Sequence, residues 1–203
     1  MLRTGGLTSP PMSGVLLCGG ESSRMGFDKA LLEMDGRMIV EVLAERLGDV
    51  CDEVLLATGQ PGRLGWMDYP EVADAVAYAG PLAGLVAAFT EAKHEMLAVI
   101  AVDMPAANPV LLRYLADRVM DFDAALPEGS RGPEPLHAVY GRSALPALER
   151  GLHGRDRSMR GVVADLRVNV CPSRELLQAG FGTSFAANVN DPDDLWMLRH
   201  EVG

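Results

Sequence analysis

Short apolar runs and amphipathic stretches alternate along the first half of this chain. The apolar runs predict strands, at residues 13–18, 53–58, 71–73 and 96–102. Between the strands, apolar residues recur at helical spacing, as Ile39, Leu43 and Leu47 do. They predict helices at residues 38–50, 82–93 and 109–120. Each predicted strand is therefore followed by a helix or a loop before the next strand begins.

The second half continues the alternation. Strands are predicted at residues 122–126, 136–140 and 167–171, and helices at residues 142–151, 158–166 and 191–200. Asp191 is expected to cap the last helix. This order predicts a single three-layer, Rossmann-like α/β domain over residues 13–203, with a mostly parallel central sheet that binds ligands at the carboxyl ends of its strands. Residues 1–12 are rich in Gly, Thr, Ser and Pro and are expected to form a disordered tail.

The first strand ends in an unusual loop. Cys18 is followed by Gly19 and Gly20, and the next ten residues bring Arg24 and Lys29. Glycines let backbone N–H groups approach an anion closely, and the two cations add positive charge. The spacing fits neither the G-x-x-x-x-G-K-[ST] phosphate loop nor the G-x-G-x-x-G dinucleotide fingerprint. The remaining interpretation is a longer loop that binds a polyphosphate. The alternative is a strand-to-helix turn with solvated charges.

Composition narrows the class. The formal net charge is −10, so a polyphosphate site has to be built locally, and general binding to nucleic acid is not expected. No apolar run is long enough for a membrane span, and the N-terminus lacks the apolar core of a signal peptide. The three cysteines stand at unrelated spacings, which favours reduced thiols in the cytoplasm over a zinc site.

Two more polar clusters follow predicted strands. Asp103 comes directly after the apolar run 96–102, where a carboxylate needs compensation for lost hydration. A Mg²⁺ ion that bridges it to phosphates would provide this, and the alternative is a cap of the next helix. Asp74 either accepts hydrogen bonds from a nucleoside or is a surface turn residue. The nearby Gly80-Pro81-Leu82-Ala83-Gly84 stretch indicates either close approach to a ligand or close helix–sheet packing.

The second half offers weaker candidates. His137 lies in an apolar strand. A histidine in such a strand is more often a core residue with satisfied hydrogen bonds than a catalyst. A basic cluster near a helix start could hold a second anionic substrate or form a solvated face; it consists of Arg155, Arg157 and Arg160. Asn188 and Asn190 precede the last predicted helix, and Asn190 could fix a polar ring. Cations, glycines and one metal carboxylate suit phosphoryl or nucleotidyl transfer, in which positioning and charge neutralisation dominate.

Residues 17–32 resemble the signature L-A-G-G-x-S-x-R-M-G-x-D-K-A-L-L of the molybdenum cofactor guanylyltransferases, nucleotidyltransferases of glycosyltransferase-A-like fold. The similarity continues through residues 80–84, 103–105, 135–140 and 188–195. It implies an enzyme that joins GMP from GTP to molybdopterin and releases pyrophosphate with Mg²⁺. It also implies transient contact with molybdopterin-synthesis or molybdoenzyme delivery proteins.

The resemblance also implies roles for individual residues. Backbone groups of Leu17, Cys18 and Gly19 would contact the guanine, while Arg24 and Lys29 would bind the triphosphate and Asp103 the metal. The same similarity places further residues at the nucleotide, namely Gly20, Asp74, Gly80, Pro81 and Leu82. The candidates for contact with the pterin are Arg155, Arg157, Arg160, Asn188 and Asn190.

The chain departs from the family pattern in two places. Cys18 replaces the usual alanine, and Ala57 stands where the family often has an asparagine that contacts the nucleotide. Cytidylyltransferases for the same cofactor usually have L-A-A-G in the loop, so Gly19 favours GTP over CTP. A sugar-phosphate nucleotidyltransferase is a further alternative, and a nucleotide-binding module without catalysis is another; intact Arg24, Lys29 and Asp103 favour an enzyme.

Overall fold

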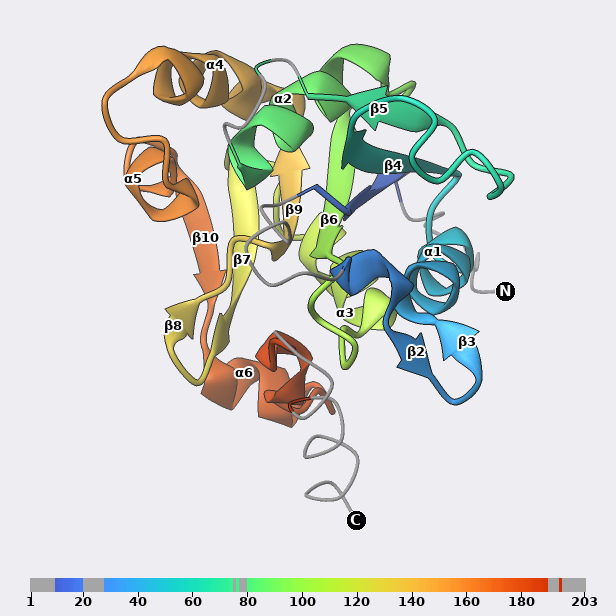
Figure 1. The fold of residues 1–203 in the computed structure, drawn as a ribbon. Coiled ribbons are helices and arrows are strands. Elements are labelled where there is room, and N and C mark those ends of the chain that lie inside the picture. Colours follow the sequence, from blue (N-terminus) through green and yellow to red (C-terminus); the bar gives the residue numbers. More distant parts are fainter. Residues whose placement is uncertain (1–9, 20–27, 75, 77–79, 190–193, 195–203) are drawn as a thin grey trace, which may run out of the picture.

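The computed structural model describes residues 10–19, 28–74, 76, 80–189 and 194. Its main sheet has the strand order β10-β7-β9-β6-β1-β4-β5 (Figure 1). The strands span Ser13–Leu17 (β1), Glu53–Gly59 (β4), Glu71–Ala73 (β5), Met96–Ala101 (β6), Ala124–Gly129 (β7), His137–Gly141 (β9) and Val168–Cys171 (β10). A short strand, β8 (Gly132–Pro133), pairs with β7. The expected mostly parallel sheet is confirmed.

The parallel part of the sheet is centred on β1. This strand pairs in parallel with β4 on one side and with β6 on the other. All its residues are buried, as expected for a strand covered by helices on both faces. The three strands therefore end at the same edge of the sheet, where an α/β fold places its ligands.

Strand β9 departs from the parallel pattern. It lies between β6 and β7 and is antiparallel to both. Only seven residues separate the end of β7 at Gly129 from the start of β9 at His137. A parallel connection needs a crossover of a dozen residues or more, so this short link, which contains β8, can return the chain only in the opposite direction.

Helices cover the two faces of the sheet (Figure 1). They span Ile39–Gly48 (α1), Pro81–Glu91 (α2), Pro109–Ala116 (α3), Leu145–His153 (α4), Met159–Val163 (α5) and Ser173–Gln178 (α6). Buried residues of α1, α3 and α6 belong to one apolar cluster, and those of α2, α4 and α5 to a second. The expected three layers follow from these two cores.

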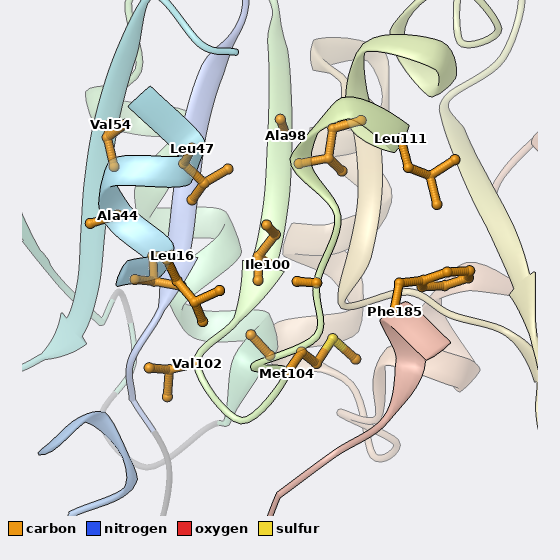
Figure 2. Close-up of a cluster of buried hydrophobic side chains, with 14 of the residues drawn as sticks. Leu16, Ala44, Leu47, Val54, Ala98, Ile100, Val102, Met104, Leu111 and Phe185 are labelled. Carbon is orange, nitrogen blue, oxygen red and sulfur yellow. The ribbon is translucent and has the colours of Figure 1, made fainter. Parts of the chain in front are cut away.

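Figure 2 shows the first core. Leu16 of β1 and Ile100 of β6 meet Leu47 of α1 and Leu111 of α3 there. Phe185, from a short 3-10 turn (η4, Ser184–Ala186), extends the same cluster towards the C-terminal part of the described chain. Val102 and Met104 continue it beyond the end of β6, so the segment that carries Asp103 is anchored by buried side chains on both sides.

Several elements lie outside the expectations. The two-stranded sheet of β2 (Glu33–Met34) and β3 (Arg37–Met38) was not predicted, nor was α6. Of the predicted helix 191–200, only residue 194 is described, and it is helical. Of the expected tail, the structure describes residues 10–12, in which Met12 is fully buried and the Pro10 carbonyl accepts a hydrogen bond from Arg113. Among the helices of the described segments, none is long and apolar enough to cross a bilayer.

Candidate active site

The ends of three strands bring the polar clusters of the sequence together. Leu17 of β1 pairs with Ala57 of β4 on one side and with Ala101 of β6 on the other. Cys18, Thr58 and Val102 are the next residues along these chains, so the segments that follow all leave from one edge. Lys29 and Asp103 therefore lie next to each other although they are 74 positions apart in the sequence.

Lys29 and Asp103 form an ion pair at this edge. Lys29 Nζ lies 3.4 Å from Asp103 Oδ2, and both side chains are mostly buried, 17% and 25% exposed. Lys29 begins a 3-10 turn, η2 (Lys29–Leu31), which Asp28 caps by accepting a hydrogen bond from the Ala30 N–H. A lysine and a carboxylate side by side provide a positive charge for a phosphate and a ligand for the metal that the phosphate binds.

Asp103 is not a helix cap. The side chain of Asn108 accepts from the Val110 N–H and caps α3, which removes that alternative. Asp103 Oδ1 is buried and has no hydrogen-bond partner among the described residues. A buried carboxylate oxygen without a partner is costly, and a bound cation is one way to compensate it. The site therefore fits a divalent metal at Asp103.

The main chain of Asp103 reaches the other end of the sequence. Its carbonyl accepts a hydrogen bond of 2.7 Å from the Val189 N–H. Val189 itself is buried and stands directly after Asn188. Asp103 thus contacts Lys29 through its carboxylate and the segment that carries Asn188 through its main chain.

Asp74 lies beside the end of β4. Its N–H points to the Gly59 carbonyl at 3.4 Å, and burial raises the pKa of its carboxyl above the usual range. A Cβ added at Gly84 of α2 would lie 3.1 Å from Ala57 Cβ, 3.2 Å from Leu17 Cδ2 and 3.5 Å from Asp74 Oδ1. Gly84 therefore serves close packing of α2 on the sheet.

Gly80 has a different function from Gly84. Its φ is +71° and its ψ is −160°, a conformation that side chains with a Cβ rarely adopt, and nothing lies within 4 Å of an added Cβ. Pro81 is the first residue of α2, while the side chain of Leu82 is fully buried. Contact between Leu82 and a nucleotide would therefore have to be made by its main chain.

The main-chain groups of Cys18 and Gly19 are already engaged. Both N–H groups donate to the Ala57 carbonyl at 2.9 Å. Burial raises the pKa of the Cys18 thiol to about 12, so it is not a nucleophile at neutral pH. A Cβ added at Gly19 would meet only ordinary contacts, the nearest being Gly59 N at 3.6 Å. Among the described residues, a methyl group at Gly19 therefore meets no clash.

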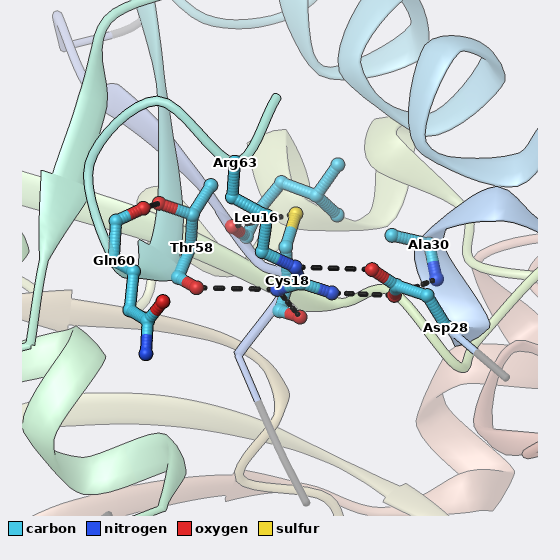
Figure 3. Close-up of polar contacts among 7 residues, drawn as sticks. All are labelled: Leu16, Cys18, Asp28, Ala30, Thr58, Gln60 and Arg63. Atoms are coloured by element: carbon cyan, nitrogen blue, oxygen red, sulfur yellow. Dashed lines mark hydrogen bonds and ion pairs between the residues drawn. The ribbon is translucent and has the colours of Figure 1, made fainter. Parts of the chain in front are cut away.

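Arg63 belongs to the site and was missed in the sequence. It lies in the loop between β4 and β5, and its guanidinium pairs with both carboxylate oxygens of Asp28. One guanidinium nitrogen also donates to the Cys18 carbonyl at 2.8 Å and to the Thr58 carbonyl at 3.1 Å (Figure 3). Its neighbours Pro61, Gly62 and Gly65 mark a loop, but nothing in the local pattern indicates what the arginine contacts.

A polar pocket lies beside the β7–β8 hairpin. Its lining consists of Gly129, Ser130, Arg131, Gly132, Pro133, Glu134, Arg160, Ala186 and Asn188. Two residues expected on the pterin side, Arg160 and Asn188, are therefore brought together although they come from α5 and from the segment after η4. Arg131 and Glu134 of the lining were not predicted as site residues.

Glu134 links this pocket to Asp103 electrostatically. Burial raises the pKa of its carboxyl, a hydrogen bond of 3.0 Å from the Leu136 N–H opposes this, and the nearby charge of Asp103 adds to the increase. Arg160 and Arg131 act in the opposite direction. The pocket and the ion pair of Lys29 with Asp103 are therefore parts of one electrostatic environment.

The remaining predicted residues are spread more widely. Arg155 and Arg157 are exposed and do not line the pocket, so the structure does not group them with Arg160. Gly20, Arg24 and Asn190 lie outside the described residues, and their expected roles stay predictions.

His137 is a core residue. It is fully buried in β9, and its ring lies 5.0 Å from that of Phe185. Burial lowers its pKa to about 3, although the Asn108 backbone weakly opposes this. Neither ring nitrogen has a conventional hydrogen-bond partner within the described part of the chain. The histidine is neutral at physiological pH and is a core residue as expected, but it is not the satisfied histidine that was expected from the sequence.

Among the described residues, no group of three or more His, Cys, Asp or Glu side chains could hold a metal by itself. A metal bound here would therefore depend on Asp103 together with ligand oxygens. Mg²⁺ tolerates this because it binds through one or two carboxylates plus phosphates and water.

A mostly parallel sheet defines a nucleotide-binding α/β protein of the nucleotidyltransferase class where its central strands are followed by a glycine-rich sequence and by an ion pair of a lysine with a metal-binding carboxylate. The chain belongs to the MobA-like NTP transferase domain family, whose model matches residues 14–170. The family resemblance inferred from the glycine loop and the later motifs is thereby confirmed.

Named relatives agree over nearly the whole chain. A "Probable molybdenum cofactor guanylyltransferase" of Pelotomaculum thermopropionicum is 36% identical over 92% of this chain and 91% of its own length. A "Molybdenum cofactor guanylyltransferase" of Desulfosudis oleivorans is 30% identical over 91% of this chain and 92% of its own. The crystal structure of "Molybdopterin-guanine dinucleotide biosynthesis protein A" from Archaeoglobus fulgidus is 25% identical, covers 94% of this chain and 98% of its own, and superimposes with a TM-score of 0.81.

Proposed function

We propose that this protein transfers GMP from GTP to molybdopterin and releases pyrophosphate. One observation carries the proposal: Asp103 connects the two sides of the site. Its carboxylate pairs with Lys29 of the glycine loop, and its carbonyl accepts from Val189, next to Asn188 of the polar pocket. An enzyme that joins a nucleotide to a second phosphate-bearing substrate needs this proximity.

The nucleotide would bind over the ends of β1 and β4. Lys29, with Arg24 in the expected role, would neutralise the triphosphate, and the glycine loop would bring backbone N–H groups close to it. Asp74 would accept hydrogen bonds from the nucleoside. Gly80, whose φ is positive, and the start of α2 would contact the nucleotide through their main chain.

Mg²⁺ is the metal that fits this site. Asp103 would hold it through its buried Oδ1, which has no hydrogen-bond partner among the described residues, and phosphate oxygens and water would complete the coordination of the ion. Bound there, the ion would neutralise charge that develops on the phosphates. Lys29 would add a fixed positive charge on the side of Asp103 Oδ2.

Molybdopterin would bind in the pocket of the β7–β8 hairpin. Arg160 and Asn188 line it, and a phosphate monoester is a natural partner for an arginine fork. An oxygen of this phosphate would attack the α-phosphorus of GTP, and the bond to the β-phosphate oxygen would break, so that pyrophosphate leaves. Asn190 would add a contact to the pterin, whereas Arg155 and Arg157 would act only as surrounding positive charge.

The three free cysteines Cys18, Cys51 and Cys171 support a reducing, cytoplasmic location for this reaction. Transient contact with the proteins that supply molybdopterin or receive the product belongs to the same proposal. No residue of the described chain is assigned to such a contact.

The test is pyrophosphate release by the purified protein with Mg²⁺ and molybdenum-loaded molybdopterin, with GTP compared against CTP. Release with GTP alone supports the proposal. Release with CTP alone would assign the protein to cytidylyl transfer and show that Gly19 does not select the base. Nucleotide binding without release would favour another acceptor or a non-catalytic module.

A further inference from the structure

Arg63 connects three separate segments near the candidate active site. Its guanidinium pairs with Asp28, which directly precedes Lys29, and donates to the carbonyls of Cys18 and Thr58 (Figure 3). Cys18 follows β1, and Thr58 lies near the end of β4. The arginine therefore holds the residue before Lys29 against the ends of two central strands.

The contact continues from Asp28 to the catalytic edge. Asp28 Oδ1 accepts a hydrogen bond of 3.0 Å from the Ala30 N–H and so caps the 3-10 turn that Lys29 begins. Lys29 in turn reaches Asp103 Oδ2. A shift of Asp28 would move the start of this turn, and with it the lysine, relative to the sheet that fixes Asp103.

The geometry of the contact needs an arginine. The guanidinium offers five donors in one plane, and here three of its nitrogens serve a carboxylate and two carbonyls. The side chains of Arg63 and Asp28 are only 24% and 26% exposed, so the pair is shielded from much of the solvent. A lysine could keep the charge but could not reproduce the fork.

A second arginine provides a structural counterpart. Arg142 also binds one carboxylate, that of Glu95, and donates to the backbone carbonyls of Phe89, Ala92 and His94. These contacts lie in the last turn of α2 and between α2 and the start of β6, at the edge of the sheet opposite Asp103. Arg142 therefore has the same kind of contacts without any connection to Lys29.

We propose that Arg63 is a positioning residue for Lys29: by holding Asp28 on the ends of β1 and β4, it keeps the lysine at the place where the triphosphate binds. This inference rests on the proposed function, in which Lys29 acts on the phosphates of the nucleotide. In this role Arg63 acts on Lys29 through Asp28.

A double-mutant cycle tests the proposal, with the full chain, Mg²⁺, GTP and molybdenum-loaded molybdopterin. Lys29→Ala is expected to lower kcat/KM for GTP by about 300-fold, and Arg63→Ala by about 30-fold. The double variant should fall no more than about threefold below Lys29→Ala, because a positioning residue has nothing left to position. Asp28→Asn keeps an oxygen for the Ala30 N–H but loses the ion pair, so it should resemble Arg63→Ala.

Two further variants separate positioning from general stability. Arg63→Lys should recover less than half of the lost activity on a logarithmic scale, because it lacks the fork. Arg142→Ala should lower the Tm by several degrees, as Arg63→Ala does, but should leave kcat and KM within about twofold of the wild-type values. Equal losses from Arg63→Ala in the presence and absence of Lys29 would overturn the proposal, as would full activity of Arg63→Ala.

The cycle also separates this proposal from the proposed function. If the wild-type protein transfers no GMP, the proposed function fails, and the same four proteins are compared by their Kd for a fluorescent GTP. Coupling between Arg63 and Lys29 in these Kd values would still support the positioning role. Additive Kd changes, or no binding of the GTP analogue by the wild-type protein, would overturn it.

Discussion

The two halves of the site differ in how their polar groups are held. On the nucleotide side, Arg63, Asp28 and Lys29 are linked to one another and to Asp103 by hydrogen bonds and ion pairs. In the pocket beside the β7–β8 hairpin, the structure shows no hydrogen bond from the side chains of Arg131 and Arg160 to the described residues. The side chains of the nucleotide side are therefore held in place without a ligand, whereas the arginines of the pocket are left to bind one.

This difference has an energetic meaning. Groups fixed before binding lose little entropy when the nucleotide enters and are placed for the transition state. The side chains of the pocket must be ordered by the ligand itself, which costs about 0.5–1.5 kcal/mol for each long side chain. We therefore expect substitutions on the nucleotide side to lower kcat, and substitutions in the pocket to raise the KM for the acceptor.

The largest effect is expected from Asp103→Asn. The variant keeps the shape of the side chain but weakens metal binding and removes the partner of Lys29, so kcat should fall by at least about 10³-fold. Pyrophosphate release measures this. Asp123→Asn serves as the control, because Asp123 pairs with Arg167 away from the site and its loss should change kcat by less than about twofold. An Asp103→Asn variant with more than a tenth of wild-type kcat would contradict the assignment.

The pocket is tested by Arg160→Ala. Removal of an arginine that binds a phosphate should raise the KM for molybdopterin about 10- to 100-fold, while the KM for GTP changes by less than about twofold. Arg155→Ala and Arg157→Ala are matched controls from the same basic stretch that do not line the pocket, and their effect should stay below about threefold. Equal effects from all three arginines would mean that the stretch acts as a diffuse charge.

The same two regions differ in how far the sequence predicts them. The strands at residues 13–18, 53–58 and 96–102 are buried on both faces, so continuous apolar runs indicated them correctly. Their parallel order then placed Lys29 and Asp103 at one edge, because the carboxyl ends of such strands coincide. This half of the site depends on short-range motifs and on one rule of topology.

The pocket depends on long-range packing that the motifs do not contain. Arg160 and Asn188 lie 28 positions apart in the sequence, yet both line the pocket beside the β7–β8 hairpin. Arg63 was missed for a similar reason, since its partners Cys18 and Asp28 lie 45 and 35 residues away. No local pattern indicates which arginine of a loop will bind such distant groups.

One omission had a local signal. Asp35 and Gly36 both have positive φ, as a two-residue hairpin turn of this kind requires, and they connect β2 to β3. An Asp-Gly pair between two short strands is a strong hairpin signal. The strands are only two residues long, however, so their apolar pattern is too short to be recognised.

His137 lies on β9 between the two regions. Its titration tests whether this part of the sheet is a closed core without a role in the reaction. Its pKa is lowered from 6.5 to about 3 by burial, so between these values the unfolded chain binds a proton that the native protein excludes. The free energy of unfolding should therefore decrease as the pH falls below about 6.5, by about 2 kcal/mol between pH 7 and pH 5 from this residue.

Urea unfolding of the wild-type protein and of His137→Leu at both pH values isolates this contribution. The variant should lose less stability on acidification than the wild-type protein, by the same amount of about 2 kcal/mol. GTP-dependent activity of the variant near pH 7 should remain within about threefold, since the ring is buried against Phe185. Equal pH dependence of the two proteins would mean that His137 titrates normally and is accessible.

The smallest effect is expected from Asp74→Asn, at the edge of the nucleotide side. Asp74 is not part of the network that joins Arg63, Asp28 and Lys29, and burial already raises the pKa of its carboxyl. The amide keeps one acceptor oxygen for a ribose hydroxyl, so only the charge-assisted part of the contact is lost, and the KM for GTP should rise about fivefold with kcat nearly unchanged. Asp68→Asn, at an exposed acid of the loop between β4 and β5, should change neither constant. A large decrease in kcat from Asp74→Asn would instead place this carboxylate beside the reacting phosphates. The nucleotide side would then include a residue that is not linked to Arg63, Asp28 and Lys29.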